Sequence, residues 1–163
     1  MRYRILLFIF CAAAFKATAQ SNEAITIEGT TINQLLAQAS LQTKSEKRYD
    51  YIAVNNGMMI VTDSLFMRGY DKKFDLYLKR HHVLLKDIAD VIFEKKIAAL
   101  WCRIVLKPGT TSYKYFNYEG KEEENREGIL FILDKSFSKG DGPDQLKEAF
   151  RKLFVAAGLS SPF

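Results

Sequence analysis

A two-residue alternation of apolar side chains, running from residue 51 to residue 133, constrains the fold of this chain more than any other feature. It is clearest from Ala98 to Lys107, where Leu100, Cys102, Ile104 and Leu106 fall on one side of an extended chain. Successive side chains of a β-strand point to opposite faces, so this pattern predicts a strand with one apolar face. Together with the turn signals between them, such patterns predict seven strands, at residues 51–54, 58–66, 74–79, 88–95, 98–107, 112–118 and 128–133.

The segments between these strands carry the signals of turns and linkers. Asn55-Asn56-Gly57 predicts a tight turn, because Asn and Gly tolerate positive φ. We interpret the polar residues from Gln42 to Arg48 as a linker and those from Glu119 to Glu127 as a charged turn. His81 and His82 precede an apolar stretch and are expected at a strand end or a bend.

Two segments have the spacing of a helical face instead. After a short strand expected at Ala24–Ile27, apolar residues at steps of three and four predict a helix from Thr31 to Ser40. Near the C-terminus, Pro143 suits a first helical turn and Gly158 suits a stop. The apolar stripe between them consists of Leu146, Phe150, Leu153, Phe154 and Ala157. The chain is therefore expected to be α+β, with an N-terminal helix and a C-terminal helix that caps the sheet.

Residues 1–19 have the layout of a cleavable secretory signal. Arg2 and Arg4 precede an apolar run from Ile5 to Phe15, and Ala17-Thr18-Ala19 offers the small residues that a signal peptidase reads. The run is shorter than the roughly 20 residues of a membrane span, so we expect no transmembrane segment in the mature chain. The expected organisation is a signal peptide at 1–19, an N-terminal strand, helix and linker at 20–48, a β-domain with its helix at 49–158, and a tail at 159–163. The protein is then exported, and periplasmic or secreted.

The net charge does not favour a nucleic-acid partner. The chain has 24 Lys and Arg residues against 19 Asp and Glu residues, for a formal charge of +5. Three of the basic residues, Arg2, Arg4 and Lys16, lie in the expected leader, so the mature chain has a charge of only about +2. We therefore expect no nucleic-acid binding.

From Tyr49 onward, the expected order of seven strands and one amphipathic helix resembles the pleckstrin-homology-like fold. Two phrases carry the likeness, VLLKDIADV at Val83–Val91 and LKEAFRKL at Leu146–Leu153, and similar phrases occur in small exported bacterial proteins of unassigned function. The resemblance covers residues 49–158 and implies a seven-stranded antiparallel barrel or roll closed at one end by the helix. Lipid-binding members of that family place Lys or Arg in the first hairpin, where this chain has Asn55-Asn56-Gly57, so phosphoinositide binding is not implied.

One candidate ligand-binding group is basic and lies beside the only two histidines of the chain. It consists of Lys72, Lys73, Lys79, Arg80, His81 and His82. Such a cluster suits an anionic envelope surface, although solvated cations of this kind are common. Adjacent residues of a strand point to opposite faces, so the two histidines do not form a chelating pair, and we expect no metal site and no cofactor.

A second candidate group is the aromatic pair Tyr113 and Tyr115, which share a face of one expected strand. Rings in this position can stack on a sugar or a peptide, and they can equally pack against a neighbouring strand. Cys102 is the only cysteine outside the expected leader, and its alternating neighbours predict a buried position on an apolar strand face.

The sequence contains no motif that specifies a reaction. It has no Gly-x-Ser-x-Gly elbow and no phosphate-binding or dinucleotide-binding loop, so we expect a non-enzymatic protein. We expect a binding or scaffolding domain of the bacterial envelope, whose partner is an envelope protein or a small ligand. One alternative is a small-ligand carrier with a cavity in the sheet near the tyrosines, and a second is a hydrolase that uses Cys102 or His82.

These hypotheses predict different structures. A scaffold requires an exposed apolar or aromatic patch. A carrier requires an apolar pocket lined by sheet residues. A hydrolase requires an exposed Cys102 within hydrogen-bond reach of a histidine.

Overall fold

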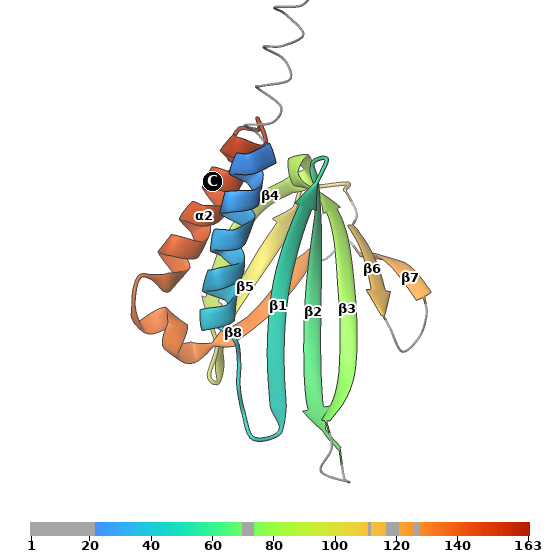
Figure 1. Ribbon diagram of the computed structural model, residues 1–163, viewed down its shortest axis with the longest axis vertical. Helices are drawn as coiled ribbons and strands as arrows, with labels where there is room; N and C mark the ends of the chain where they lie inside the picture. The colour runs from blue at the N-terminus through green and yellow to red at the C-terminus, as the bar shows by residue number, and fades with distance from the viewer. Residues whose placement is uncertain (1–21, 70–73, 111, 117–120, 126–127) are drawn as a thin grey trace, which may run out of the picture.

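The computed structural model describes residues 22–69, 74–110, 112–116, 121–125 and 128–163. Within these ranges the chain forms two α-helices and eight strands, which confirms an α+β fold (Figure 1). The strands make two antiparallel sheets. The five-stranded sheet contains, in spatial order, β1 (Glu46–Asn55), β2 (Met58–Arg68), β3 (Phe74–Leu84), β6 (Ser112–Phe116) and β7 (Lys121–Asn125). The three-stranded sheet contains β4 (Ile88–Lys95), β5 (Ala99–Leu106) and β8 (Ile129–Asp134).

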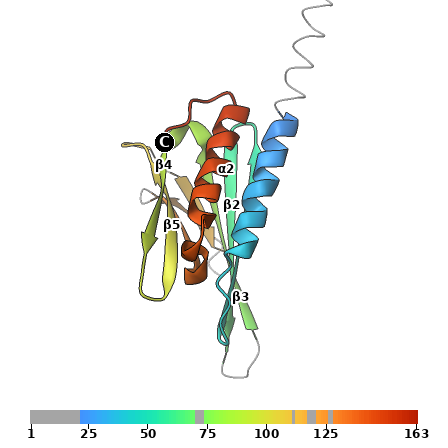
Figure 2. The ribbon, with the colours of Figure 1, turned by 90° about the vertical axis from the view of Figure 1, so that its left-hand side faces the viewer.

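The two helices lie side by side against the sheets (Figures 1 and 2). The N-terminal helix is described over residues 22–38, and α2 runs over Gly142–Ala156. Apolar side chains from both helices and both sheets form one buried cluster. The predicted stripe of the C-terminal helix is confirmed, because Leu146, Phe150, Leu153 and Phe154 of α2 are buried in this cluster.

Local sequence explains how the strands are connected. Asn56 and Gly57 have φ values of 49° and 74°, which makes the predicted two-residue turn between β1 and β2. A 3₁₀ turn at Leu85–Asp87 leads from β3 into the second sheet. Gly128 also has a positive φ, 84°, and a Cβ atom there would lie 2.2 Å from the Ile104 carbonyl oxygen, so β8 approaches β5 at a point where only glycine fits.

The expected seven-stranded barrel or roll is antiparallel as predicted, but its strand number is wrong and no closed barrel forms. The described strands number eight, and they form two separate sheets. The hairpin of β6 and β7 pairs with β3, whereas β8 returns to pair with β5. The chain therefore crosses between the two sheets three times, after β3, β5 and β7, which strand alternation alone does not reveal.

The short strand expected at Ala24–Ile27 is also wrong, because these residues belong to the N-terminal helix. Ile25 packs against the core cluster, and Ile32 is buried in it seven residues, or two turns, further along. A helix that begins before Thr31 therefore extends one apolar face over the sheets, and this packing overrides the local pattern of four residues.

Two segments interpreted as irregular are strands instead. The expected linker at 42–48 contains the start of β1, held by a hydrogen bond from the Arg48 N–H to the Leu41 carbonyl at 3.0 Å. The expected charged turn at 119–127 contains β7, which pairs with β6 over five residues. In both places a neighbouring strand supplies main-chain partners to a polar sequence, so tertiary pairing decides the structure. His81 and His82 likewise lie within β3 rather than at its end.

Candidate functional site

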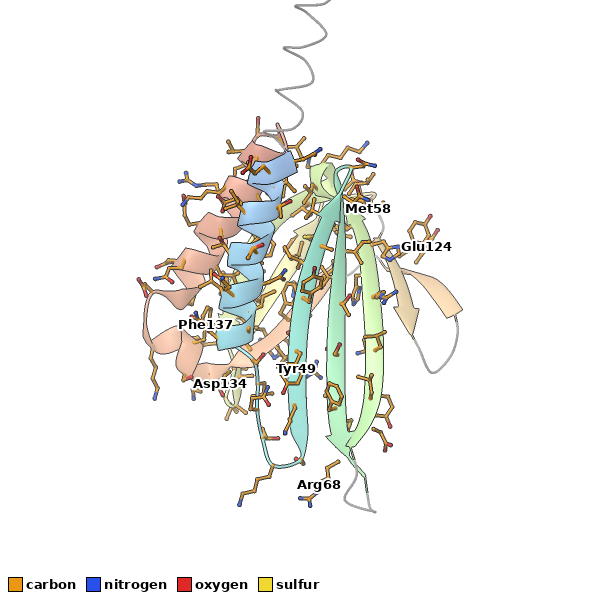
Figure 3. The ribbon with its side chains drawn as sticks, in the orientation of Figure 1. Tyr49, Met58, Arg68, Glu124, Asp134 and Phe137 are labelled. Carbon is orange, nitrogen blue, oxygen red and sulfur yellow. The ribbon has the colours of Figure 1, made fainter. Side chains whose placement is uncertain are left out.

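The outer face of the five-stranded sheet, turned away from the core, exposes several large apolar side chains. Directly opposed residues of antiparallel strands share a face, so the pairing register identifies its members. Four of its rows are Lys47–Phe66–Leu76, Tyr49–Ser64–Leu78, Tyr51–Thr62–Arg80 and Ala53–Ile60–His82–Tyr113. Tyr49 and Phe66 meet edge to face, with ring centroids 5.8 Å apart. Figure 3 labels Tyr49 on β1.

The centre of this face combines two tyrosines with an arginine. Tyr51 is 54% exposed and Tyr113 is 49% exposed, although both lie within strands. Arg80 is exposed between them, and within the described part of the chain it has no ion pair. Its positive charge is therefore free to meet an anionic or aromatic group of another molecule.

The sequence-predicted site residues are divided between the two faces of β3. Arg80 and His82 lie on the outer face, together with Tyr113 of β6. Lys79 and His81 lie on the inner face, where His81 is buried. The two histidines therefore point to opposite faces, as predicted. The remaining candidates cannot be placed on this surface: the Tyr115 side chain, and residues Lys72 and Lys73, lie outside what the structure describes.

A polar cluster on the inner face was missed by the sequence reasoning. Asp63 of β2 is only 7% exposed and accepts from the Arg48 guanidinium at 3.4 Å. The same guanidinium donates to the Glu46 carboxylate at 2.6 Å. Asp50 lies directly opposite Asp63 in the register, and Lys79 lies on its other side in β3.

Burial dominates the electrostatics of the two aspartates. It raises the pKa of Asp50 to about 8, and the neighbouring charge of Asp63 adds to this rise while Arg48 opposes it. Burial also raises the pKa of Asp63, against the opposing effects of Arg48 and Lys79. The available signal was the position of Asp63, which is in phase with the buried Met59 and Val61 along β2.

Cys102 is fully buried on the inner face of β5, as its neighbours predicted. Burial raises the pKa of its thiol far above the ordinary range, and the charge of Asp50 adds to the effect. His82, the histidine that the hydrolase alternative would use, lies on the outer face of the other sheet. The arrangement that the hydrolase alternative requires is therefore not formed by these two residues.

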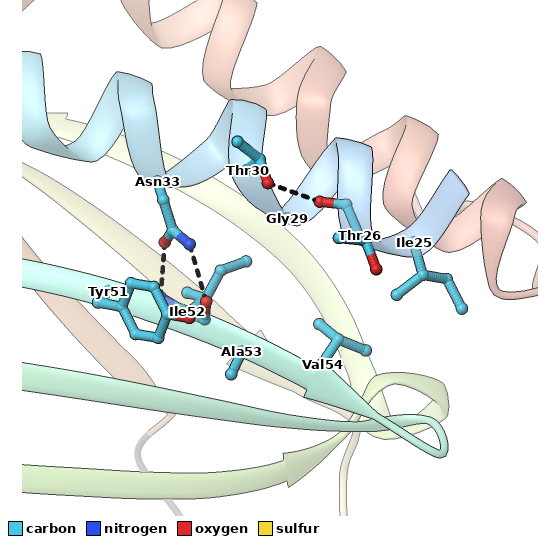
Figure 4. A pocket seen from close by; sticks show the side chains of 9 residues that line it. All are labelled: Ile25, Thr26, Gly29, Thr30, Asn33, Tyr51, Ile52, Ala53 and Val54. Carbon is cyan, nitrogen blue, oxygen red and sulfur yellow. Dashed lines mark hydrogen bonds between the residues drawn. The ribbon is translucent and has the colours of Figure 1, made fainter. Parts of the chain in front are cut away.

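A small hollow of about 180 Å³ separates the N-terminal helix from the edge of β1 (Figure 4). Asn33 closes one end of it, since its side chain accepts from the Ile52 N–H at 2.7 Å and donates to the Ile52 carbonyl at 2.9 Å. The other lining residues are Ile25, Thr26, Gly29, Thr30, Tyr51, Ala53 and Val54. Typical small-molecule sites have about 300–1,000 Å³, so this hollow is smaller than such a site.

Within the described ranges, no group of three or more His, Cys, Asp or Glu side chains is arranged to hold a metal ion. Neither helix in those ranges is both long and apolar enough to cross a membrane.

Comparison with models of protein families, with curated proteins and with solved structures found no match for this chain. Any function must therefore be argued from the surfaces themselves.

Proposed function

We propose that this protein is an exported, non-enzymatic binding module that holds a partner protein of the bacterial envelope on the outer face of its five-stranded sheet. One observation carries the proposal: Arg80 is exposed on the outer face of the five-stranded sheet, with the exposed Tyr51 in its own row and the exposed Tyr113 in the next row. The exposed large apolar members of this face are Tyr49, Tyr51, Leu76 and Tyr113.

The composition of this face suits a protein partner. Tyr and Arg are enriched at the centres of protein interfaces, where they account for most of the binding free energy. Tyrosine offers a rigid ring with a polar end, so it gains contact area at a low cost in side-chain entropy. The row of Tyr51, Thr62 and Arg80 also places a hydroxyl between the ring and the cation.

Export is supported by the leader pattern at residues 1–19, and the fold contributes nothing to that part of the proposal. The resemblance to pleckstrin-homology-like domains contributes nothing either, because the two sheets are not closed into a barrel. The proposed role rests on the exposed face alone.

Site-specific photocrosslinking in the native envelope tests the proposal. A photoreactive phenylalanine analogue placed at Tyr51 is expected to capture one discrete protein species. The same analogue placed at Ile97 is the matched control, because Ile97 is apolar and 95% exposed but lies in the turn between β4 and β5, away from the outer face. Combining the Tyr51 probe with Arg80→Glu is expected to reduce capture about tenfold or more, since the substitution reverses a central charge.

Two results would contradict the proposed function. One is equal capture of the same species at positions 51 and 97, which would indicate non-specific contact. The other is a Tyr51 adduct that survives Arg80→Glu unchanged, which would remove the arginine from the surface that binds.

A further inference from the structure

Asp50 and Asp63 face each other at the closest kind of cross-strand position. Both main-chain groups of Ile52 bind the Asn33 side chain, so they point away from β2. The pair Ile52–Val61 therefore exchanges no hydrogen bonds between β1 and β2. Pair types alternate along an antiparallel ladder, and Asp50–Asp63 lies two residues away, so it is of the same non-hydrogen-bonded type. The Cβ atoms of such pairs are about 4.5–5.5 Å apart, which brings the two carboxyl groups within reach of each other.

Among the described residues named below, the charges around this pair are balanced when one carboxyl group is neutral. Arg48 of β1 binds Asp63 and Glu46, and Lys79 of β3 lies opposite Asp63. Three ionised carboxylates would therefore face two cations. From the other sheet, Cys102 of β5 is within electrostatic range of Asp50 and adds no positive charge, and His81 lies one row further along β3.

Asp63 also has a carboxylate oxygen that lacks a donor. Its Oδ2 atom accepts from Arg48 at 3.4 Å, but its Oδ1 atom is buried and accepts no hydrogen bond from any residue that the structure describes. A buried acceptor of this kind normally has a partner, because leaving it unsatisfied costs the free energy of its lost hydration. A protonated Asp50 is the neighbouring group with a hydrogen to donate.

We propose that Asp50, which is partly buried, and Asp63, which is buried, form a carboxylic acid–carboxylate pair that binds a single proton between β1 and β2. The O–H of Asp50 donates to Asp63, and Arg48 neutralises the remaining negative charge. This proton stabilises the packing of β1, an edge strand, against β2. When the proton is lost, two carboxylates repel each other in a buried site and β1 is destabilised. The inference goes beyond the proposed binding function and does not depend on it.

The direction of the pH effect follows from the burial of Asp50. Its pKa is raised to about 8 in the folded protein, so the folded protein keeps a proton that the unfolded chain releases near pH 4. Between about pH 4 and pH 8, this site should raise the unfolding equilibrium constant by about tenfold for each pH unit. Stability from this site is thus present at acid pH and is lost as the pH rises.

The test compares Asp50→Asn with the unmodified protein in urea denaturation from pH 4 to pH 9. Asparagine is neutral at all pH values and can donate to Asp63, so it should mimic the protonated form. The two proteins are expected to unfold at similar urea concentrations near pH 4. As the pH rises above 4, the variant should become progressively more stable than the unmodified protein. Asp75→Asn is the matched control, because Asp75 is an exposed aspartate in the neighbouring strand β3 and should leave the pH profile unchanged.

A second measurement does not require a variant that folds. Carboxyl ¹³C NMR of the unmodified protein, with Asp50→Asn and Asp63→Asn for assignment where they fold, should show one aspartate that titrates well above pH 6. Titration of every aspartate below pH 6 would overturn the proposal. So would an Asp50→Asn variant whose stability follows that of the unmodified protein at every pH.

Discussion

Asn33 connects the N-terminal helix to the free edge of β1. One amide side chain satisfies both main-chain groups of Ile52 (Figure 4). An edge strand with unpaired main-chain groups can pair with another chain, so a side chain that occupies them also protects the sheet against association. Asparagine suits the task because its amide both donates and accepts.

Replacing this amide should weaken the fold measurably. Asn33→Ala removes two hydrogen bonds and leaves both main-chain groups of the buried Ile52 without these partners, so we expect a loss of about 1–3 kcal/mol in the free energy of unfolding. Urea denaturation at fixed pH measures the change. The neighbouring Gln34→Ala, which alters an exposed residue of the same helix, should change stability by no more than about 0.5 kcal/mol. Equal effects of the two substitutions would show that the Asn33 bonds contribute nothing.

The sequence predicted the positions of some functional candidates correctly and did not predict others. Alternation correctly predicted that Cys102 is buried and that the two histidines diverge. It did not reveal the Asp50–Asp63 pair, because the predicted strand began at residue 51. The pair was nevertheless encoded by the turn, since a two-residue loop at Asn56-Gly57 sets Asn55 opposite Met58 and therefore Asp50 opposite Asp63.

Among the elements, α2 packs on the core through one apolar face. Its apolar stripe faces the sheets while Lys152 faces solvent, as the spacing of the sequence predicted. By contrast, β7 has a charged sequence with no strand pattern, and it forms because β6 offers a free edge. Elements that bury an apolar face are therefore readable from the sequence, and elements that depend on a neighbour's main chain are not.

The stripe of α2 makes a direct prediction about stability. Phe150 is fully buried, so Phe150→Ala should leave a cavity and cost about 3–5 kcal/mol in the free energy of unfolding. Lys152→Ala, two residues away on the exposed side, should cost no more than about 0.5 kcal/mol. Chemical denaturation of both variants measures the difference. A Phe150→Ala variant as stable as Lys152→Ala would mean that α2 does not complete the core.

At the scale of the whole molecule, the N-terminal helix joins the two sheets. Asn33 binds β1 of the five-stranded sheet, and the carbonyl of Ala39 accepts from the Asp134 N–H of β8 at 2.7 Å in the other sheet. Ile32 and Leu36 between them are completely buried in the common core. The segment expected to lead into a separate β-domain is therefore part of the same hydrophobic core, which the spacing of Thr31–Ser40 alone does not show.

This arrangement predicts that helix and sheets unfold together. Leu36→Ala should cost about 2–5 kcal/mol, because it removes a buried side chain at the junction. Trp101, the only tryptophan, lies on β5 and reports on the three-stranded sheet by fluorescence, while far-ultraviolet circular dichroism also reports on the helices. In Leu36→Ala both signals should shift to the same lower urea concentration, as two-state unfolding requires. Ile27→Ala, at an exposed position of the same helix, should shift neither. If the tryptophan transition stayed in place while the helical signal moved, the helix would be an appendage, and the two sheets would have to be joined without it.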